Sequence, residues 1–141
     1  MTASHHQIVR DFLAALSRGD LRDDMLTSDF SGWTVISGPI GRQAYQRAFE
    51  IFPRIFAEGP SPTIHSLTAE GDRVVAEFRS QGTLLNGDVY QNDYLFLFRI
   101  RDGQIAYIGE YFNPDVVRAK IAPAMAAAMA RGNQARRTTE E

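Results

Sequence analysis

Two carboxylates and one arginine are the residues of this 141-residue chain whose types and spacing could do chemistry. Glu77 and Arg79 lie two positions apart in an alternating stretch, and Glu110 ends a later one. One guanidinium cannot fully neutralise two acids, so one carboxyl group can have a raised pKa and transfer protons near neutral pH. We take Glu110 as the candidate catalytic base, Arg79 as an orienting group, and Glu77 as an acid or the partner of the arginine. The same three residues could instead form a structural ion-pair network.

Three predicted strands between residues 74 and 114 have to position these side chains. Asn86-Gly87 is a two-residue hairpin signal, since both residues tolerate positive φ. A turn centred there pairs Arg79 with Tyr94. Because strand side chains alternate, one face of the sheet then collects Glu77, Arg79, Gln81, Asn92, Tyr94 and Phe96.

The second hairpin, at residues 101–103, permits two registers. A two-residue loop sets Glu110 beside Leu95. A three-residue loop with Gly103 in a left-handed bulge sets Glu110 opposite Tyr94 and turns it toward the other polar groups. We favour the bulged loop, although a one-residue slip would reverse the faces.

Aromatic and polar residues around this cluster predict a small-molecule pocket. A helix expected over residues 41–57 carries an aromatic ridge from Tyr45 to Phe56, and Pro53 should kink it. The residues expected to contact a ligand are Trp33, Phe52, Phe56, Gln81, Asn92, Tyr94, Phe96 and Phe112. Ordinary packing is the alternative for several of them, including Trp33, Asn92 and Tyr94.

The remaining pattern indicates an α+β domain with helices covering one sheet face. Helices are expected over residues 4–18 and from Asn113 onward, the latter interrupted by Pro123, with strands at 33–36 and 63–68. Residues 1–132 would form a single domain and residues 133–141 a disordered tail.

The opposite sheet face is expected to be apolar and exposed, which predicts a homodimer packed sheet to sheet. Its residues are Phe78, Leu95, Leu97, Tyr107 and Tyr111.

Composition excludes several classes of function. The chain has no cysteine, so disulfides and thiol chemistry are excluded. A net charge of −2 argues against a nucleic-acid partner. The sequence has no apolar run long enough for a membrane span and no basic leader, so the cytoplasm is expected. Histidines and carboxylates lack metal-ligand spacing, and we expect neither metal nor cofactor.

Four short motifs carry a family resemblance: Arg18-Gly19-Asp20, Gly41-Arg42, residues 70–74 and residues 102–112. With them the chain resembles the nuclear transport factor 2-like superfamily, of the SnoaL-like and ketosteroid-isomerase-like kind. The resemblance implies a cystatin-like roll, in which a curved antiparallel sheet forms a cone covered on its concave face by N-terminal helices. It also implies a homodimer and a pocket between helices and sheet.

The resemblance constrains chemistry residue by residue. Steroid isomerases of this fold need an aspartate and two oxyanion donors, and the matching places near Ser37, Phe12 and Phe96 lack them. Limonene-epoxide-hydrolase-like members have a catalytic aspartate that matches Glu110. Their Arg-x-Asp pair falls on residues 77–79 with the charges reversed.

The sequence therefore favours a protein that binds a small, largely apolar, oxygenated molecule. It could be a cofactor-independent isomerase or hydrolase that uses carboxylate acid/base catalysis. The alternatives are a non-catalytic ligand-binding or dimerisation module, and a structural dimer whose cone is filled by its own side chains.

Overall fold

A computed structural model describes residues 2–140, with the side chains of residues 5–134. Its six strands form one sheet in the order β2-β1-β6-β5-β4-β3. The strands are β1 (Leu26–Thr34), β2 (Gly38–Gly41), β3 (Phe56–Glu70), β4 (Arg73–Leu84), β5 (Val89–Arg101) and β6 (Gln104–Phe112). The helices are α1 (Thr2–Arg18), α2 (Arg42–Ile51), α3 (Pro114–Val116) and α4 (Ala122–Glu140). Short 3-10 turns lie at Asp23–Met25 and Phe52–Ile55, and a π-helical turn at Val117–Ile121.

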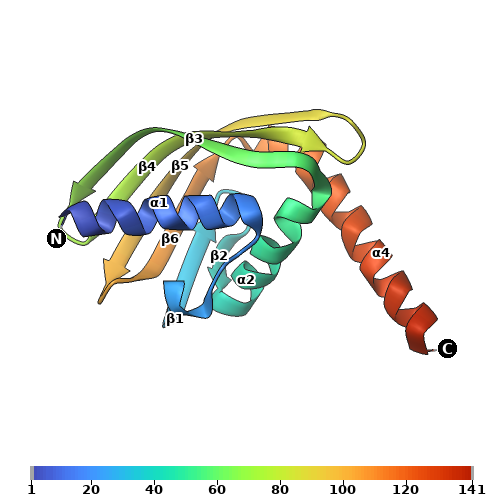
Figure 1. Cartoon of the computed structure of the whole chain (residues 1–141), viewed down its shortest axis with the longest axis horizontal. Coiled ribbons are helices and arrows are strands. Elements are labelled where there is room, and N and C mark those ends of the chain that lie inside the picture. Colours follow the sequence, from blue (N-terminus) through green and yellow to red (C-terminus); the bar gives the residue numbers. More distant parts are fainter. Residues whose placement is uncertain (1, 141) are drawn as a thin grey trace.

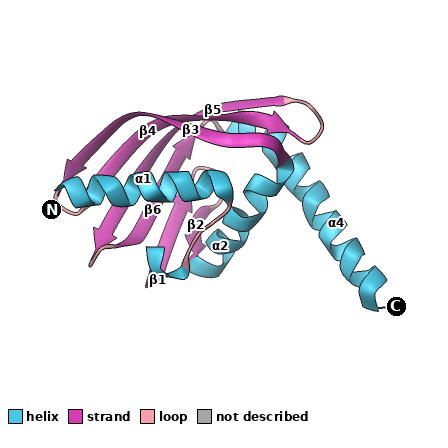
Figure 2. Ribbon diagram, viewed as in Figure 1, coloured by secondary structure: helices cyan, strands magenta, loops and turns pink. Residues whose placement is uncertain are grey.

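The sheet is curved and unclosed, and α1 and α2 cover its concave side (Figure 1). α1 runs across the strands, α2 lies beside it, and α4 extends away from the body to the C-terminus (Figure 2). The α+β cone predicted from the sequence is confirmed. The sheet is not purely antiparallel, however, because β1 and β6 pair in parallel. None of the described helices is long and apolar enough to cross a membrane.

α1 forms because apolar residues recur on one face and then pack on the sheet. Val9, Phe12 and Leu13 are fully buried. The Phe12 ring meets the Phe98 ring of β5 edge-on at 5.5 Å between centroids. The helix ends at Gly19, whose φ of +66° is a left-handed conformation that favours glycine.

α2 is shorter than the sequence predicts, because it ends at Ile51 rather than near Ala57. Pro53 cannot continue the helix, since its ring removes a backbone donor and clashes with the preceding turn. The chain passes into the 3-10 turn and enters β3 at Phe56. Phe56 is therefore a strand residue rather than the end of a helical ridge.

The β4–β5 hairpin differs from the prediction by one residue. The backbone N–H of Leu84 donates to the carbonyl of Asp88 at 2.8 Å, which leaves residues 85–87 as a three-residue loop, with Gly87 at φ +90°. The backbone N–H of Leu85 donates to the carbonyl of Ile55, which anchors the loop. Phe78, not Arg79, consequently pairs with Tyr94. Because side chains alternate, this single shift reverses both faces of β4.

The β5–β6 hairpin adopts neither of the two predicted registers. Its turn has two residues, Asp102 at φ +53° and Gly103 at φ +77°. A bulge between Arg99 and Ile100 then moves the register, so that Glu110 pairs with Phe96. Glu110 still faces the concave side, although it is not opposite Tyr94.

The C-terminal segment turns back over the cone after β6. The Asn113 side chain accepts a hydrogen bond from the backbone N–H of Asp115 and begins α3. Pro123 does not end the helical segment, because the π-helical turn leads directly into α4, which contains Pro123 and continues beyond it. α4 continues as helix to Glu140, whereas the sequence predicts disorder from residue 133. Alanine, arginine and glutamine in this stretch are good helix formers. Residue 141 lies outside the described residues.

Candidate active-site cavity

A cavity of about 310 Å³ lies between the concave sheet face, α2 and the C-terminal segment. This volume is at the lower end of the roughly 300–1,000 Å³ typical of small-molecule sites. Seven aromatic side chains line it, namely Tyr45, Phe49, Phe52, Phe78, Tyr94, Phe96 and Phe112. Val117 and Ile121 of the π-helical turn and Met125 of α4 also line the cavity. The ligand space is therefore largely apolar and of modest size.

Glu110 is the only acid on the cavity wall, and no lysine, arginine or histidine lines the cavity among the described residues. The hydroxyl of Tyr45 donates a hydrogen bond of 2.6 Å to Glu110 Oε2. Burial raises the pKa of Glu110 to about 7, against the opposing effect of the Tyr45 hydrogen bond. The Glu110 residue keeps some accessible surface, but its carboxyl group is enclosed by protein. Glu110 can therefore take up or release a proton near neutral pH.

Two separate elements hold the Glu110–Tyr45 pair. Glu110 lies on β6 beside Thr34 of β1, and its carbonyl accepts a hydrogen bond of 3.2 Å from the backbone N–H of Val35. Tyr45 lies on the buried face of α2, with its ring 5.0 Å from the Phe30 ring. Burial, and then the nearby Glu110, raise the pKa of Tyr45, so its hydroxyl stays protonated as a donor.

Tyr94 is the second tyrosine on the cavity wall. Its ring stacks on the Phe78 ring, with centroids 5.2 Å apart and planes 8° apart. Its hydroxyl hydrogen-bonds to that of Tyr90, which is fully buried beneath the cavity. Burial raises the pKa of Tyr94 well above its usual value, so this side chain is neutral at physiological pH.

Comparison with known sequences identifies the family. The sequence profile of the SnoaL-like domain matches residues 9–108. This chain belongs to the SnoaL-like family. No curated protein matches it.

Solved structures extend the likeness of this SnoaL-like protein. A nuclear transport factor 2-like protein from Anabaena variabilis is 30% identical, with a TM-score of 0.67 over 79% of this chain and 88% of that one. A limonene-epoxide-hydrolase-like (LEH-like) epoxide hydrolase from M. tuberculosis is 21% identical, with a TM-score of 0.67 over 92% of this chain and 97% of that one. A candidate SnoaL-like polyketide cyclase from Jannaschia is 19% identical, with a TM-score of 0.65 over 85% and 92%. The last two likenesses concern the fold alone.

The predicted cluster of two acids around one arginine is wrong. Arg79 lies on the convex face, where its Nε donates a 2.8 Å hydrogen bond to Asp93 Oδ1. That hydrogen bond lowers the pKa of Asp93. Glu77 is also on the convex face and accepts a 3.1 Å hydrogen bond from Ser66 Oγ. The one-residue shift of β4 separates both side chains from Glu110.

Of the eight residues expected to contact a ligand, four line the cavity and four do not. The four that line it are Phe52, Tyr94, Phe96 and Phe112. Gln81 is exposed on the convex face, for the same reason as Arg79. Trp33 also lies on the convex face, with its ring 5.1 Å from the Tyr111 ring.

The other two predicted contacts are structural. Phe56 packs in the core, with its ring edge-on to the Tyr90 ring at 5.9 Å. Asn92 is buried, but its amide donates a 3.1 Å hydrogen bond to the carbonyl of Asn113. Its Oδ1 accepts from the backbone N–H of Asp93. Both ends of the Asn92 amide therefore have partners within the fold.

Sequence reasoning missed Tyr45 and Ser80 as site residues. The sequence places Tyr45 in an aromatic ridge, although a tyrosine among phenylalanines is itself a signal that a polar tip needs a partner. Ser80 could be found only with the correct register, because the predicted one turns it to the convex face.

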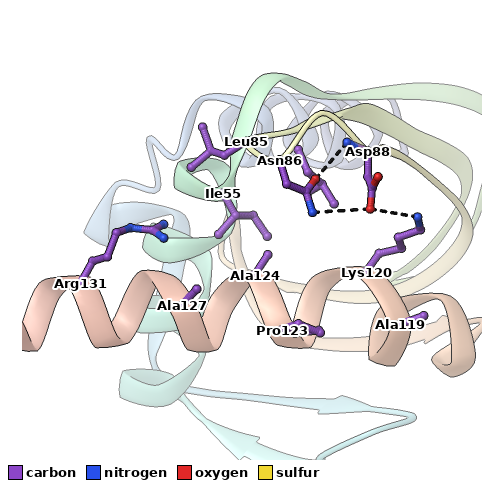
Figure 3. Close-up of a pocket in the computed structure, with 11 residues that line it drawn as sticks. Ile55, Leu85, Asn86, Asp88, Ala119, Lys120, Pro123, Ala124, Ala127 and Arg131 are labelled. Atoms are coloured by element: carbon purple, nitrogen blue, oxygen red, sulfur yellow. Dashed lines mark hydrogen bonds and ion pairs between the residues drawn. The ribbon is translucent and has the colours of Figure 1, made fainter.

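A second, smaller cavity of about 230 Å³ lies between α4 and the β4–β5 loop and shares no lining residue with the first (Figure 3). Its wall includes Leu85, Lys120 and Arg131. Lys120 Nζ lies 3.3 Å from Asp88 Oδ2, and both side chains are more than one-third exposed. An exposed ion pair of this kind contributes little to the stability of the fold. The larger cavity, with its enclosed carboxyl group, is therefore the stronger candidate site.

Proposed function

We propose that this SnoaL-like protein binds an uncharged, largely aromatic molecule and transfers a proton on it through Glu110. One observation carries the proposal: a carboxyl group with a pKa of about 7 on the wall of an aromatic cavity. A general acid or base is most effective when its pKa lies near the working pH. Apolar walls also exclude water from the reacting groups.

The hydrogen bond from Tyr45 gives the two oxygens of the Glu110 carboxyl group different roles. Because Tyr45 donates to Oε2, Oε1 is available to the ligand. Ionised Glu110 would remove a proton from a carbon next to a carbonyl, and the resulting acid would return the proton to another carbon. The net reaction is an isomerisation that needs no cofactor. In a hydrolytic variant, Oε1 would accept the proton of an attacking water instead.

The charge of the cavity supports an uncharged ligand. The described wall has no cation to pair with a bound carboxylate or phosphate. An anion there would lie beside Glu110 without compensation, at a cost of several kcal/mol. Two structural neighbours are named as an epoxide hydrolase and a candidate polyketide cyclase. Both names imply oxygenated organic substrates, which is compatible with the proposed ligand.

A non-catalytic ligand-binding role is the second candidate. It is favoured by the position of Glu77 and Arg79, which leaves Glu110 without a second acid or an orienting cation on the described cavity wall. Binding in that case would rest on the aromatic walls alone.

Exchange of α-protons tests catalysis. Wild-type protein in deuterium oxide is mixed with 4-acetylbiphenyl, an uncharged two-ring ketone, and deuterium incorporation at the methyl carbon is followed by proton NMR. We expect exchange above the buffer rate, loss of that excess in Glu110→Gln, and retention in the Arg79→Ala control. Binding without Glu110-dependent exchange would favour the ligand-binding role.

We further propose a homodimer through the convex sheet face. Leu95 is 42% exposed and Tyr111 is 44% exposed there, with Leu97, Tyr107 and Trp33 partly exposed beside them. Phe78, which the sequence placed on this surface, is buried in the cone instead. An exposed apolar patch on one sheet face suits a second copy of the same face.

The oligomeric state tests this proposal. Light scattering coupled to size-exclusion chromatography should give a dimer mass for wild type and a monomer mass for Leu95→Glu. A control substitution at exposed Gln7 on α1 should leave the dimer intact. A monomeric wild type at micromolar concentration would contradict the proposed interface.

A further inference from the structure

Ser80 on β4 is a polar group of the cavity that the proposed chemistry does not use. The residue is only 5% exposed, and it lines the cavity. No described residue hydrogen-bonds to its Oγ. Ser80 Oγ is not among the enclosed polar atoms that lack a partner, so it keeps surface open to the cavity, where a ligand can hydrogen-bond to it.

The other hydroxyls on the cavity wall already have partners. Tyr45 donates to Glu110, and Tyr94 bonds to Tyr90. Thr34 Oγ1 accepts from the backbone N–H of Ser37 at 2.9 Å. Ser37 Oγ donates to the carbonyl of Gly38 at 2.8 Å. Among the hydroxyls of the described wall residues, that of Ser80 is therefore the one without an internal hydrogen bond.

The register of the sheet fixes where Ser80 lies relative to Glu110. Glu110 pairs with Phe96 of β5, and Phe96 pairs with Ala76 of β4. Ser80 is four residues further along β4, on the same face. With about 4.8 Å between strands and about 3.3 Å per residue, the two Cα atoms are roughly 16 Å apart. The cavity thus has a polar group at each end.

Aromatic rings occupy the floor between these two ends. Tyr94 stacks on Phe78, the neighbour of Ser80 on the inward face of β4. Phe96 meets both rings edge-on, at 5.7 Å from Tyr94 and 4.9 Å from Phe78. Such a floor favours flat rings in the middle of a ligand. No charged side chain other than Glu110 lines the cavity among the described residues, so an ionised group at the Ser80 end would be uncompensated.

We propose that Ser80 is a specificity-determining second anchor, and that the ligand is an elongated, uncharged molecule with aromatic rings between two oxygen functions. One oxygen function lies beside Glu110, and a hydroxyl or carbonyl at the far end bonds to Ser80 Oγ. The Glu110 end of this assignment rests on the proposed function, whereas the Ser80 end rests on geometry alone.

Two matched probes test the Ser80 anchor. 4-Acetyl-4′-hydroxybiphenyl has an oxygen function at each end, and 4-acetylbiphenyl lacks only the distal hydroxyl. Isothermal titration calorimetry with wild type should show about tenfold tighter binding of the hydroxylated probe, the effect of one added hydrogen bond. Ser80→Ala should remove that preference by weakening the hydroxylated probe alone. Gln81→Ala, on the outward face of the same strand, should keep it.

Other outcomes overturn the assignment in distinguishable ways. Equal binding of the two probes by wild type, or a preference that survives Ser80→Ala, would refute the Ser80 anchor. Glu110-dependent α-proton exchange in the same samples would show that the proposed function stands even so. Failure of both probes to bind folded wild-type protein would refute the ligand class. Circular dichroism of Ser80→Ala confirms that the variant is folded, so a loss of preference cannot be a loss of structure.

Discussion

Replacing Glu110 with glutamine should stabilise the protein at pH 8 and have a much smaller effect at pH 5. Burial raises the pKa of Glu110 in the folded protein to about 7, from a value of 4.5 without the fold. Between pH 4.5 and about pH 7, the folded state holds a proton on Glu110 that the unfolded state has released. Stability therefore falls as pH rises through this window, because the folded state binds more protons. Below pH 4.5 both states are protonated, and the penalty vanishes.

The size of the effect follows from the shift in pKa. Each pKa unit corresponds to about 1.36 kcal/mol, so the penalty above pH 7 is at most about 3 kcal/mol. Contact of the carboxyl group with solvent in the cavity would reduce it. Glutamine keeps an oxygen that can accept the Tyr45 hydrogen bond, so the substitution removes the charge with little change in packing. Tyr45 and Tyr94 face the same space, but their raised pKa values keep both neutral in this range.

Urea denaturation at pH 5, 6, 7 and 8 measures the difference, with Trp33 fluorescence as the probe. With a typical slope of about 1–3 kcal/mol per molar urea, a gain of 3 kcal/mol moves the midpoint by at least about 1 M. Glu77→Gln is the matched control, since that acid is exposed on the convex face. A Glu110→Gln effect of equal size at pH 5 and pH 8 would refute the enclosed carboxyl, as would a destabilised variant at pH 8.

Three further substitutions test the same account of the site and fold. Tyr45→Phe removes the hydrogen bond that opposes the effect of burial on the Glu110 pKa. That pKa should therefore rise further, and the unfolding free energy should fall by about 1 kcal/mol. Carbon NMR of the Glu110 carboxyl group measures the pKa, and an unchanged titration would contradict this account. Arg79→Ala should leave the unfolding free energy almost unchanged, because its ion pair is exposed, and should leave the affinity for 4-acetylbiphenyl unaltered in calorimetry. A large loss of affinity would show that Arg79 does contribute to the site. Gly82→Ala should destabilise the fold by about 1–3 kcal/mol, since a Cβ there would come 2.5 Å from a backbone oxygen of β3; urea melts check this, and a neutral result would mean that the strands separate easily at this point.

The fold class could be predicted because its signals are local and repeated. Apolar spacing marked α1 and the ridge of α2, and turn residues marked both long hairpins. Element boundaries were less predictable, as the early end of α2 illustrates. There a proline changed the helix into a 3-10 turn and then a strand, rather than into a kinked helix. The outcome depended on β3 finding a partner in β4, which is a long-range pairing.

The candidate site was predictable only in part, and the faces of the strands explain why. Alternation shows which residues of one strand lie together, but it does not show how neighbouring strands are aligned. Phe52, Phe96 and Phe112 were assigned to the cavity wall, and they lie there. Arg79 was assigned to it as well and lies on the opposite face. One residue in one loop accounts for the difference.

The sequence by itself determines that this chain forms an α+β cone of the SnoaL-like family with an aromatic interior and an acid on its last strand. Only the tertiary structure decides which polar groups share that interior. The β4–β5 loop takes three residues because Leu85 can hydrogen-bond to Ile55, far away in the chain, and this turns Ser80 inward. A bulge in β5 sets Glu110 beside Phe96, within reach of Tyr45 from α2. The positions of Ser80 and Glu110 both depend on contacts between segments that are distant in the sequence. The energies of such contacts cannot be predicted from a local sequence pattern.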